Sequence, residues 1–165
     1  MSIVVYDPAG RVTSRTDCAG NTVTFGYDTM GRQTSRTYPD SSQVTQSFDK
    51  VGNRLTMTDW RGTTGWVYDS MNRVTQVTYP GGKTVGYAYD LDNERAGMRN
   101  PDGGTTGYTY DARGRMASLT NPFSETTAWV YDATGRAVKV TYGNGAYTTY
   151  QYDQAGQAGT ASARL

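Results

Sequence analysis

The sequence predicts an all-β protein in which tandem repeats form a twisted, spiralling antiparallel sheet, a partial shell or solenoid. An aromatic residue followed by Asp recurs eight times, at spacings of 21, 21, 20, 21, 21, 21 and 21 residues. Turn-forming residues recur at fixed positions between these dipeptides. The intervening segments are rich in Thr, Tyr and Val, which favour strands, and none shows a helical period. Eight anchors at a single period indicate a tandem-repeat architecture.

The aromatic–Asp dipeptides are the repeat anchors. We interpret them as structural positions, in which the ring lines one face of the sheet and the Asp caps the turn that follows. An alternative is a ladder of aromatic rings that stacks sugars, which requires the rings to be open to solvent. In chain order the anchors are Tyr6 and Asp7, Tyr27 and Asp28, Phe48 and Asp49, Tyr68 and Asp69, Tyr89 and Asp90, Tyr110 and Asp111, Tyr131 and Asp132, and Tyr152 and Asp153.

A first turn follows each anchor. Three residues after each Asp stands a residue suited to positive φ, which is Gly in most repeats and Asn in two of them. These positions are Gly10, Gly31, Gly52, Asn72, Asn93, Gly114, Gly135 and Gly156.

The residue after this turn is usually Arg, as in Arg11, Arg32, Arg73, Arg115 and Arg136. We expect each guanidinium to bind an Asp or a turn carbonyl of the next repeat. An anionic glycan or lipid partner is the alternative, and the near-neutral net charge of +1 counts against it. The pattern changes at Asn53-Arg54, Glu94-Arg95 and Gln157.

Each repeat continues with a short strand, a second turn and a returning strand. Typical outgoing strands are 12–16, 74–78 and 137–141, and Pro followed by Asp or Gly marks most second turns. The turn at 59–62 is one residue shorter, which accounts for the single spacing of 20. In the returning strand, the residue two before each anchor shares its face. These residues are Val4, Phe25, Gln46, Trp66, Tyr87, Tyr108, Trp129 and Tyr150.

The repeat array is predicted to cover residues 1–156, with eight anchors and about seven repeats. Residues 157–165 are rich in Ala, Gly, Ser and Thr, and we expect them to form a frayed or disordered tail. Neither end carries a polar capping repeat of the kind that solenoids need for solubility. We therefore expect this array to be an excerpt from a longer one.

Composition excludes several classes of function. The net charge of +1 argues against nucleic acid as a partner. The absence of His removes Ser-His-Asp and Cys-His catalysis, and Cys18 alone supports neither a disulfide nor a zinc cluster. Residues 90–94 resemble the start of a calcium loop, but Pro101 stands where the bidentate Glu belongs. No cofactor, no metal site, no signal peptide and no membrane span are predicted.

The hexapeptide at 110–115, aromatic-Asp-x-x-Gly-Arg, carries a family resemblance. It resembles the YD repeats of Rhs proteins, which also occur in bacterial toxin-complex shells, wall-associated proteins and teneurins, and the resemblance extends from Val5 to Gly156. It implies a β-strand shell, secreted or at the cell surface, that encloses a C-terminal toxin polypeptide. The family's self-cleaving Asp-Pro ending and a toxin domain are absent, since Asp7-Pro8 opens a repeat. Eight anchors are too few to close such a shell.

The leading hypothesis is a non-enzymatic shell segment that encapsulates a toxin polypeptide. Its expected partners are the remainder of a longer Rhs-like chain or the toxin cargo, and the isolated segment should form homo-oligomers through its sheet edges. The alternative is a cell-surface module that binds carbohydrate. Trp60 and Phe123 are its candidate contact residues, because they stand in second turns where Pro, Gly or Asp is expected. Packing against an adjacent turn is the simpler explanation for both. Catalysis by paired carboxylates is the weakest hypothesis.

Overall fold

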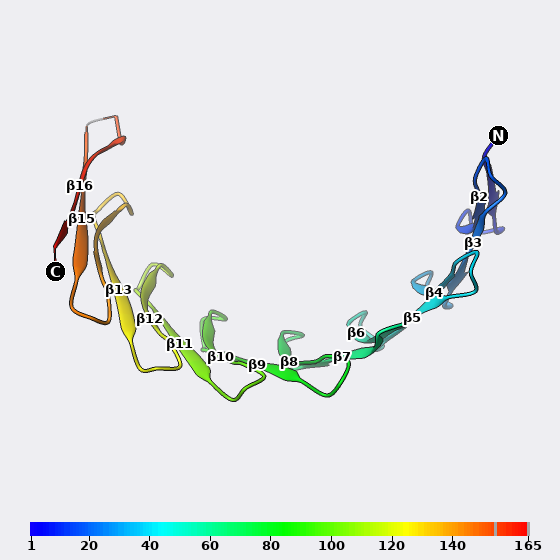
Figure 1. Ribbon diagram of the computed structural model, residues 1–165, viewed down its shortest axis with the longest axis horizontal. Coiled ribbons are helices and arrows are strands. Elements are labelled where there is room, and N and C mark those ends of the chain that lie inside the picture. Colours follow the sequence, from blue (N-terminus) through cyan, green and yellow to red (C-terminus); the bar gives the residue numbers. More distant parts are fainter. Residues whose placement is uncertain (154, 165) are drawn as a thin grey trace. The chain divides into compact units, whose positions relative to one another are not determined.

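The structure is a computed structural model that describes residues 1–153 and 155–164. In this part of the chain every regular element is a β-strand, and consecutive strands are joined by tight turns (Figure 1). The strands form two compact units, Met1–Thr84 and Val85–Leu165, which are described separately. No helix suited to crossing a membrane occurs in the described ranges.

Strand bounds repeat with the sequence period. The first unit contains β1 (Ile3–Tyr6), β2 (Val12–Thr16), β3 (Thr22–Tyr27), β4 (Gln33–Thr37), β5 (Gln43–Phe48), β6 (Arg54–Asp59), β7 (Gly62–Tyr68) and β8 (Val74–Thr78). The second contains β9 (Thr84–Tyr89), β10 (Arg95–Arg99), β11 (Thr105–Tyr110), β12 (Met116–Thr120), β13 (Thr126–Tyr131), β14 (Ala137–Thr141), β15 (Tyr147–Tyr152) and β16 (Ala158–Arg164).

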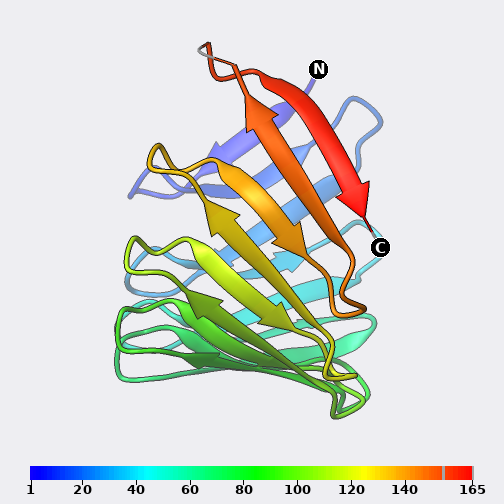
Figure 2. The same cartoon turned by 90° about the vertical axis from the view of Figure 1, so that its left-hand side faces the viewer.

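Each unit is an antiparallel meander. The order of strands in the sheet is their order in the chain, from β1 to β8 and from β9 to β16. Figure 2 shows the second unit as successive hairpins lying side by side. The first strand of a unit does not pair with its last, so neither unit closes into a barrel. The predicted all-β antiparallel sheet of tandem repeats is confirmed.

The first turn of each repeat combines a tight turn with a β-bulge. After β3, the N–H of Gly31 donates to the carbonyl of Asp28 at 3.0 Å, and Gly31 has a φ of 81°. The pairing of β3 with β4 shifts register between Gly26 and Tyr27. A left-handed residue in the turn and an extra residue in the strand belong together in this type of hairpin. The recurrence of Gly or Asn at this position therefore follows from backbone geometry.

The second turns share the left-handed residue and the tight-turn hydrogen bond, but the strands that they join pair without a register shift, as β2 with β3 and β4 with β5 do. Ser41 and Ser124 have φ values of 66° and 65°, although serine has no special preference for the left-handed region. Between β6 and β7 the loop is shorter, because Asp59 pairs directly with Gly62. The predicted shortening of this turn is confirmed.

Each unit is a single layer with very little buried surface. In β5, Val44, Gln46 and Phe48 are half-buried on one face, whereas Gln43, Thr45 and Ser47 are exposed on the other. Among the described residues only four are buried, namely Val77, Val140, Thr64 and Thr106. Val77 and Val140 lie directly opposite Trp66 and Trp129. Large rings lying over neighbouring strands thus provide most of the shielding that a second layer provides in a sandwich.

The C-terminal residues form a strand where the sequence predicted a frayed or disordered tail over 157–165. β16 pairs with β15 along its whole length, from Ala158 opposite Tyr152 to Arg164 opposite Tyr147. Pairing along an open strand edge uses main-chain groups, so a segment of Ala, Gly, Ser and Thr can add to a sheet without apolar side chains. Leu165 lies outside the described residues. The span 1–156, predicted as one array, is divided between the two units after Thr84.

Candidate functional site: Arg-linked turns and exposed aromatic residues

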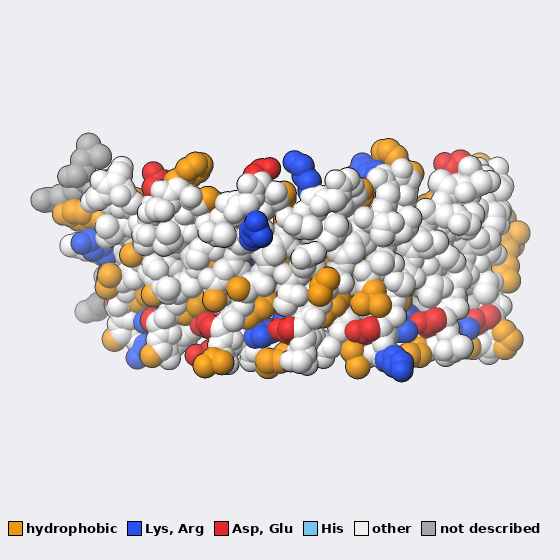
Figure 3. All heavy atoms as spheres, turned by 90° about the horizontal axis from the view of Figure 1, so that it is seen from below, with side chains coloured by type: hydrophobic (Ala, Val, Ile, Leu, Met, Phe, Trp, Pro, Cys, Tyr) orange, Lys and Arg blue, Asp and Glu red, His pale blue; other side chains and the backbone are white. Residues whose placement is uncertain are grey.

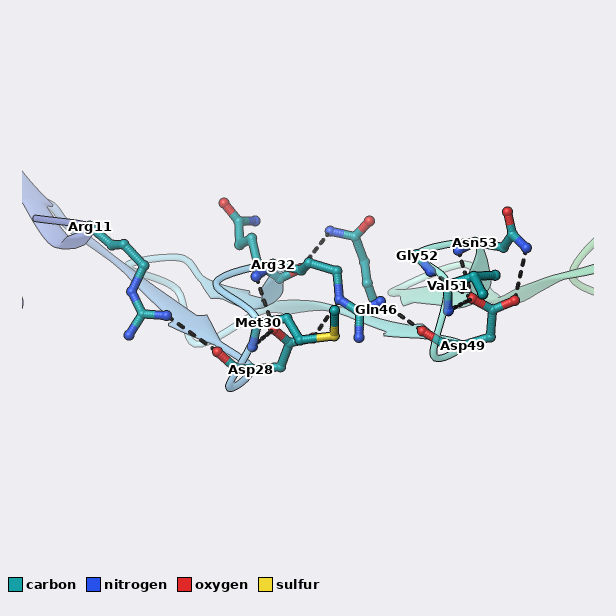
Figure 4. Close-up of polar contacts among 10 residues, drawn as sticks. Arg11, Asp28, Met30, Arg32, Gln46, Asp49, Val51, Gly52 and Asn53 are labelled. Carbon is teal, nitrogen blue, oxygen red and sulfur yellow. Dashed lines mark hydrogen bonds and ion pairs between the residues drawn. The ribbon is translucent and has the colours of Figure 1, made fainter. Parts of the chain in front are cut away.

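The Asp of each anchor organises its own turn. Oδ1 of Asp28 accepts hydrogen bonds of 2.9 Å from the backbone N–H groups of Met30 and Arg32 (Figure 4). Its Oδ2 accepts a 2.7 Å bond from Nε of Arg32. These contacts recur at Asp7, where the N–H of Arg11 is the main cause that lowers the pKa of the carboxyl. Each of these carboxylates is therefore engaged through both oxygens within its own turn.

The repeated Arg joins one repeat to the next. Nη1 of Arg32 donates to the carbonyl of Asp49 at 2.7 Å, and its guanidinium carbon lies 4.8 Å from the centre of the Phe48 ring. Arg11 makes the equivalent bond to the Asp28 carbonyl at 3.2 Å (Figure 4). The guanidinium thus lies between the carboxylate of its own turn and the ring of the following anchor. The predicted contact of these Arg residues with the next turn is confirmed.

The same ring stacking recurs along the array. Arg11 lies 4.9 Å from the Tyr27 ring, Arg115 lies 4.4 Å from the Tyr131 ring, and Arg136 lies 4.5 Å from the Tyr152 ring. Figure 3 shows the result on one face, where acidic and basic side chains lie close together along the lower rim. The charges of this rim are largely paired, which leaves little net field to attract an anionic partner.

The anchor tyrosines reach back to the preceding repeat. The hydroxyl of Tyr27 donates to the carbonyl of Val12 at 2.8 Å. Equivalent bonds of 2.8 to 3.0 Å are made by Tyr68, Tyr110, Tyr131 and Tyr152. Arg and Tyr therefore connect consecutive repeats in opposite directions. The anchor rings from Tyr27 to Tyr152 are half-buried, whereas Tyr6 is 59% exposed.

The Phe48 repeat replaces the missing hydroxyl with an amide. Phe48 cannot donate, but Nε2 of Gln46 donates to the carbonyl of Gln33 at 3.5 Å. Gln33 stands 15 residues before Phe48, the same separation as Val12 from Tyr27. Gln46 thus occupies an aromatic position in the pattern because it bonds the carbonyl that a tyrosine would reach.

Two turns depart from the Arg pattern. Nδ2 of Asn53 donates to Oδ2 of Asp49 at 2.8 Å and to Oδ1 of Asn72 at 2.7 Å. At Glu94 the charge is reversed, and a Cβ added to Gly114 would lie 2.6 Å from Oε1 of Glu94. Burial is the main cause that raises the pKa of Glu94, followed by the neighbouring carboxylates, Asp111 among them. At position 94, Glu therefore stands where other repeats have the Arg that contacts the next repeat.

Replacing Arg32 with alanine should destabilise the first unit. The loss of the Phe48 stacking and of the bond to the Asp49 carbonyl should together cost at least ~1 kcal/mol, before any contribution from the ion pair. Lysine at this position should recover only part, because it lacks the planar fork. Urea unfolding followed by circular dichroism measures both variants. Arg61→Ala is the control, because Arg61 stacks only on its neighbour Trp60. An Arg32→Lys variant as stable as the parent would contradict the role of the fork.

Trp60 and Phe123 are both open to solvent, with 81% and 83% of their surfaces exposed. Neither is covered by packing against an adjacent turn, which was the simpler expectation. Trp60 lines an open groove of about 600 Å³ together with Tyr38, Pro39 and Asp59. Phe123 extends from its turn without lining the smaller groove of about 360 Å³ nearby, which contains Glu125.

Asp111 offers little general acid chemistry. Hydrogen bonds led by the Arg115 side chain lower the pKa of Asp111 to about 2, so this group carries no proton to donate near neutral pH. Within residues 1–153 and 155–164, no three Cys, Asp or Glu side chains are grouped to hold a metal ion.

Comparison with known proteins identifies the repeat. The RHS repeat family matches at residues 6–43, 48–84, 68–104, 89–126 and 131–162. The chain belongs to this family. The resemblance to YD repeats of Rhs proteins is therefore confirmed. A comparison with curated protein sequences finds no match.

Among solved structures, this RHS repeat array is similar to the crystal structure of TcdB2-TccC3-Cdc42. The TM-score is 0.77 at 14% identity, over 97% of this chain and 10% of that chain. It is also similar to the Photorhabdus luminescens Tc holotoxin pore, with a TM-score of 0.65 at 13% identity, over 95% of this chain and 12% of that chain. The array thus spans about a tenth of the length of the chains it matches. At these identities the likeness establishes the fold.

Proposed function

We propose that this chain is a non-enzymatic wall segment of an Rhs shell that encloses a toxin polypeptide for secretion or delivery. The observation that carries the proposal is the joint between repeats. Arg11, Arg32 and Arg115 each bind their own turn, stack on the next anchor ring and bond the carbonyl of the next turn. Such a joint lets a single layer continue from repeat to repeat without a core.

The faces of the sheet also suit a wall. Both are largely uncovered, since only four described residues are buried. A sheet of this kind can present one face to an enclosed polypeptide and the other to solvent. The partners that follow are the remainder of a longer chain and its cargo, with a secreted or cell-surface location. When isolated, the segment should associate through its edges, because β1 pairs only with β2 and exposes Ile3, Val5 and Tyr6.

The test uses the polypeptide that carries this sequence in its native source. Antibodies raised against residues 1–153 would recover it for limited proteolysis, with and without urea. We expect the repeat array and a separate, non-repetitive segment to survive together in buffer. That segment should become degradable once urea unfolds the array. If every non-repetitive segment is cleaved as fast in buffer as in urea, enclosure is ruled out.

A second candidate function is a repeat module that binds carbohydrate at the cell surface. The exposure of Trp60 and Phe123, 81% and 83%, favours it, because an exposed aromatic ring is a surface on which a sugar can stack. Glycan-array binding that is lost in Trp60→Ala or Phe123→Ala would support this function. An array without signal would eliminate it and leave the proposed wall function unaffected.

A further inference from the structure

The face of the sheet that carries the anchor rings, the anchor face, has two arginines in its middle. The central residue of each outgoing strand lies on this face, opposite the residue two before the anchor, as Val77 lies opposite Trp66. In most repeats this central residue is apolar, and in β2 and β4 it is arginine. From the first repeat to the seventh, the central residues are Arg15, Arg36, Met57, Val77, Met98, Leu119 and Val140.

Arg15 is an exposed cation in apolar surroundings. It lies between Val4 and Val23 of the neighbouring strands, and all three residues line an open groove of about 510 Å³. Asp17 lines the same groove, but its Oδ1 accepts the N–H of Asn21 and its Oδ2 accepts Nδ2 of Asn21, both at 2.9 Å. Arg15 forms no ion pair with a described residue. Its guanidinium is therefore available to a ligand.

Arg36 is held by neutral groups only. Its guanidinium carbon lies 5.4 Å from the centre of the Phe25 ring and 6.0 Å from that of Tyr38. Nη1 donates to the Tyr38 hydroxyl at 3.4 Å, whereas Nε is buried and has no hydrogen-bond partner in the described part of the chain. Asp40, four residues later, accepts its bonds from Ser42 within its own turn. The half-buried charge of Arg36 would therefore gain from an anion that approaches the face.

The two arginines are spaced to meet one extended peptide. Arg15 lies opposite Val23 of β3, and Arg36 lies opposite Phe25, two residues further along the same strand. The Cα atoms of the two arginines are thus two strand spacings and one two-residue step apart, roughly 12 Å. In an extended chain, residues i and i+4 point to the same side at a separation of ~13 Å, with residue i+2 midway between them.

We propose that the anchor face of the first two repeats binds an extended acidic segment of the enclosed polypeptide, with carboxylates at i and i+4. Arg15 and Arg36 supply charge-assisted hydrogen bonds, and Val23 and Phe25 supply an apolar surface for residue i+2. The identity of this occupant rests on the proposed wall function. Titration of the isolated chain tests the site and proteolysis of the native polypeptide tests enclosure, so either can fail while the other stands.

Charge and shape together favour an acidic peptide. The arginines of the first turns already have their anion, as Arg32 has Asp28 at 2.7 Å, whereas the two central arginines have none. The apolar residues between the two central arginines suit a ligand in which charged and apolar groups alternate. An extended peptide offers this alternation, and a phosphate or a phospholipid headgroup does not.

The test titrates the chain with the acetylated, amidated peptide Gly-Glu-Thr-Leu-Thr-Glu-Gly and follows backbone amides by NMR. The amides of Val23 and Phe25 should shift in a saturable manner. The peptide with glutamine in place of both glutamates should bind at least ~5-fold more weakly, because it keeps the shape and loses the charge. Gly-Glu-Glu-Thr-Leu-Thr-Gly, of equal composition, should also bind more weakly, because its glutamates are adjacent. Vesicles of phosphatidylcholine and phosphatidylserine serve as the lipid probe.

Matched variants separate binding from folding. Arg15→Met and Arg36→Met introduce the residue that the array itself carries at Met57 and Met98, so both should fold, as read from urea midpoints. Each should weaken the peptide at least ~5-fold. Arg61→Gln is the control, because Arg61 is another exposed arginine but lies outside the central positions, and binding should be unchanged.

Four results would overturn the proposal. They are an absence of saturable shifts, equal binding of the glutamine peptide, equal binding of the peptide with adjacent glutamates, and unchanged binding in both methionine variants. Binding of the phosphatidylserine vesicles without binding of the peptide would assign the two arginines to a lipid surface instead.

Discussion

Replacing Gly143 with alanine is expected to lower the free energy of unfolding by roughly 2 kcal/mol or more, the range of overpacking in a site that cannot relax. A Cβ on Gly143 would lie 2.7 Å from Cβ of Glu125, 3.0 Å from its Cα and 3.1 Å from the backbone N of Thr126. These atoms belong to the main chain or are fixed directly to it, so no rotamer change relieves the clash. The hairpin turn at 142–146 would have to move away from the preceding one.

Urea unfolding monitored by circular dichroism measures this effect, and another glycine provides the control. Gly107 lies in β11, and a Cβ added there would meet nothing within 4 Å. Gly107→Ala should therefore be close to neutral, or slightly stabilising through the unfolded chain. If the two alanine variants unfold at the same urea concentration, close packing of neighbouring turns does not contribute to the stability of this unit.

Most of the fold could be predicted because the repeat makes local signals unambiguous. The left-handed position in the first turn permits few residues, so Gly31 and Asn72 identify the same backbone shape in different repeats. The period of two in the returning strands assigns Phe48 and Val44 to one face, as the structure shows. Because each strand within a unit pairs with the next in sequence, the topology of each unit required no long-range information.

Other features depend on contacts that a single repeat does not reveal. Gln46 could be explained only by the bond from its amide to the carbonyl of Gln33 on the neighbouring strand β4. The strand β16 was missed because main-chain pairing leaves no apolar pattern in its sequence. Of the candidate contact residues, Trp60 could be identified as unusual for its turn. Its groove could not be predicted, since Tyr38 and Pro39 come from the neighbouring hairpin.

Acidification from pH 4 to pH 2 is expected to destabilise the array progressively, because the same carboxylate recurs in most first turns. Hydrogen bonds in the folded state lower the pKa of these groups below the ordinary value of 3.8, to about 2 for Asp111. A group whose pKa is lowered by folding contributes stability above its unfolded value, and this contribution is lost as the pH falls through the folded value. The residues with a lowered pKa in these turns are Asp7, Asp28, Asp49, Asp69, Asp111 and Asp132.

Glu94 should act in the opposite direction. Its pKa is raised from 4.5, chiefly by burial and then by Asp90, Asp92 and Asp111. Because the folded state binds this proton more tightly than the unfolded chain, protonation of Glu94 stabilises the fold as the pH falls through its raised value. The two opposing trends together predict a stability maximum between the raised pKa of Glu94 and the lowered pKa values of the aspartates.

Urea midpoints measured from pH 7 to pH 2 test both limbs of this profile. Glu94→Gln should be more stable than the parent at neutral pH and should lose the gain in stability that the parent shows as the pH falls towards 4.5, while keeping the loss of stability at lower pH. Asp111→Asn should flatten part of the acid limb only, because the other aspartates still titrate. A Glu94→Gln profile identical to that of the parent would show that the carboxylate facing Gly114 is not coupled to folding. If Asp111→Asn by itself abolished the loss of stability at low pH, the acid sensitivity would come from a single turn. That result would contradict a role for the same carboxylate in turn after turn of the array.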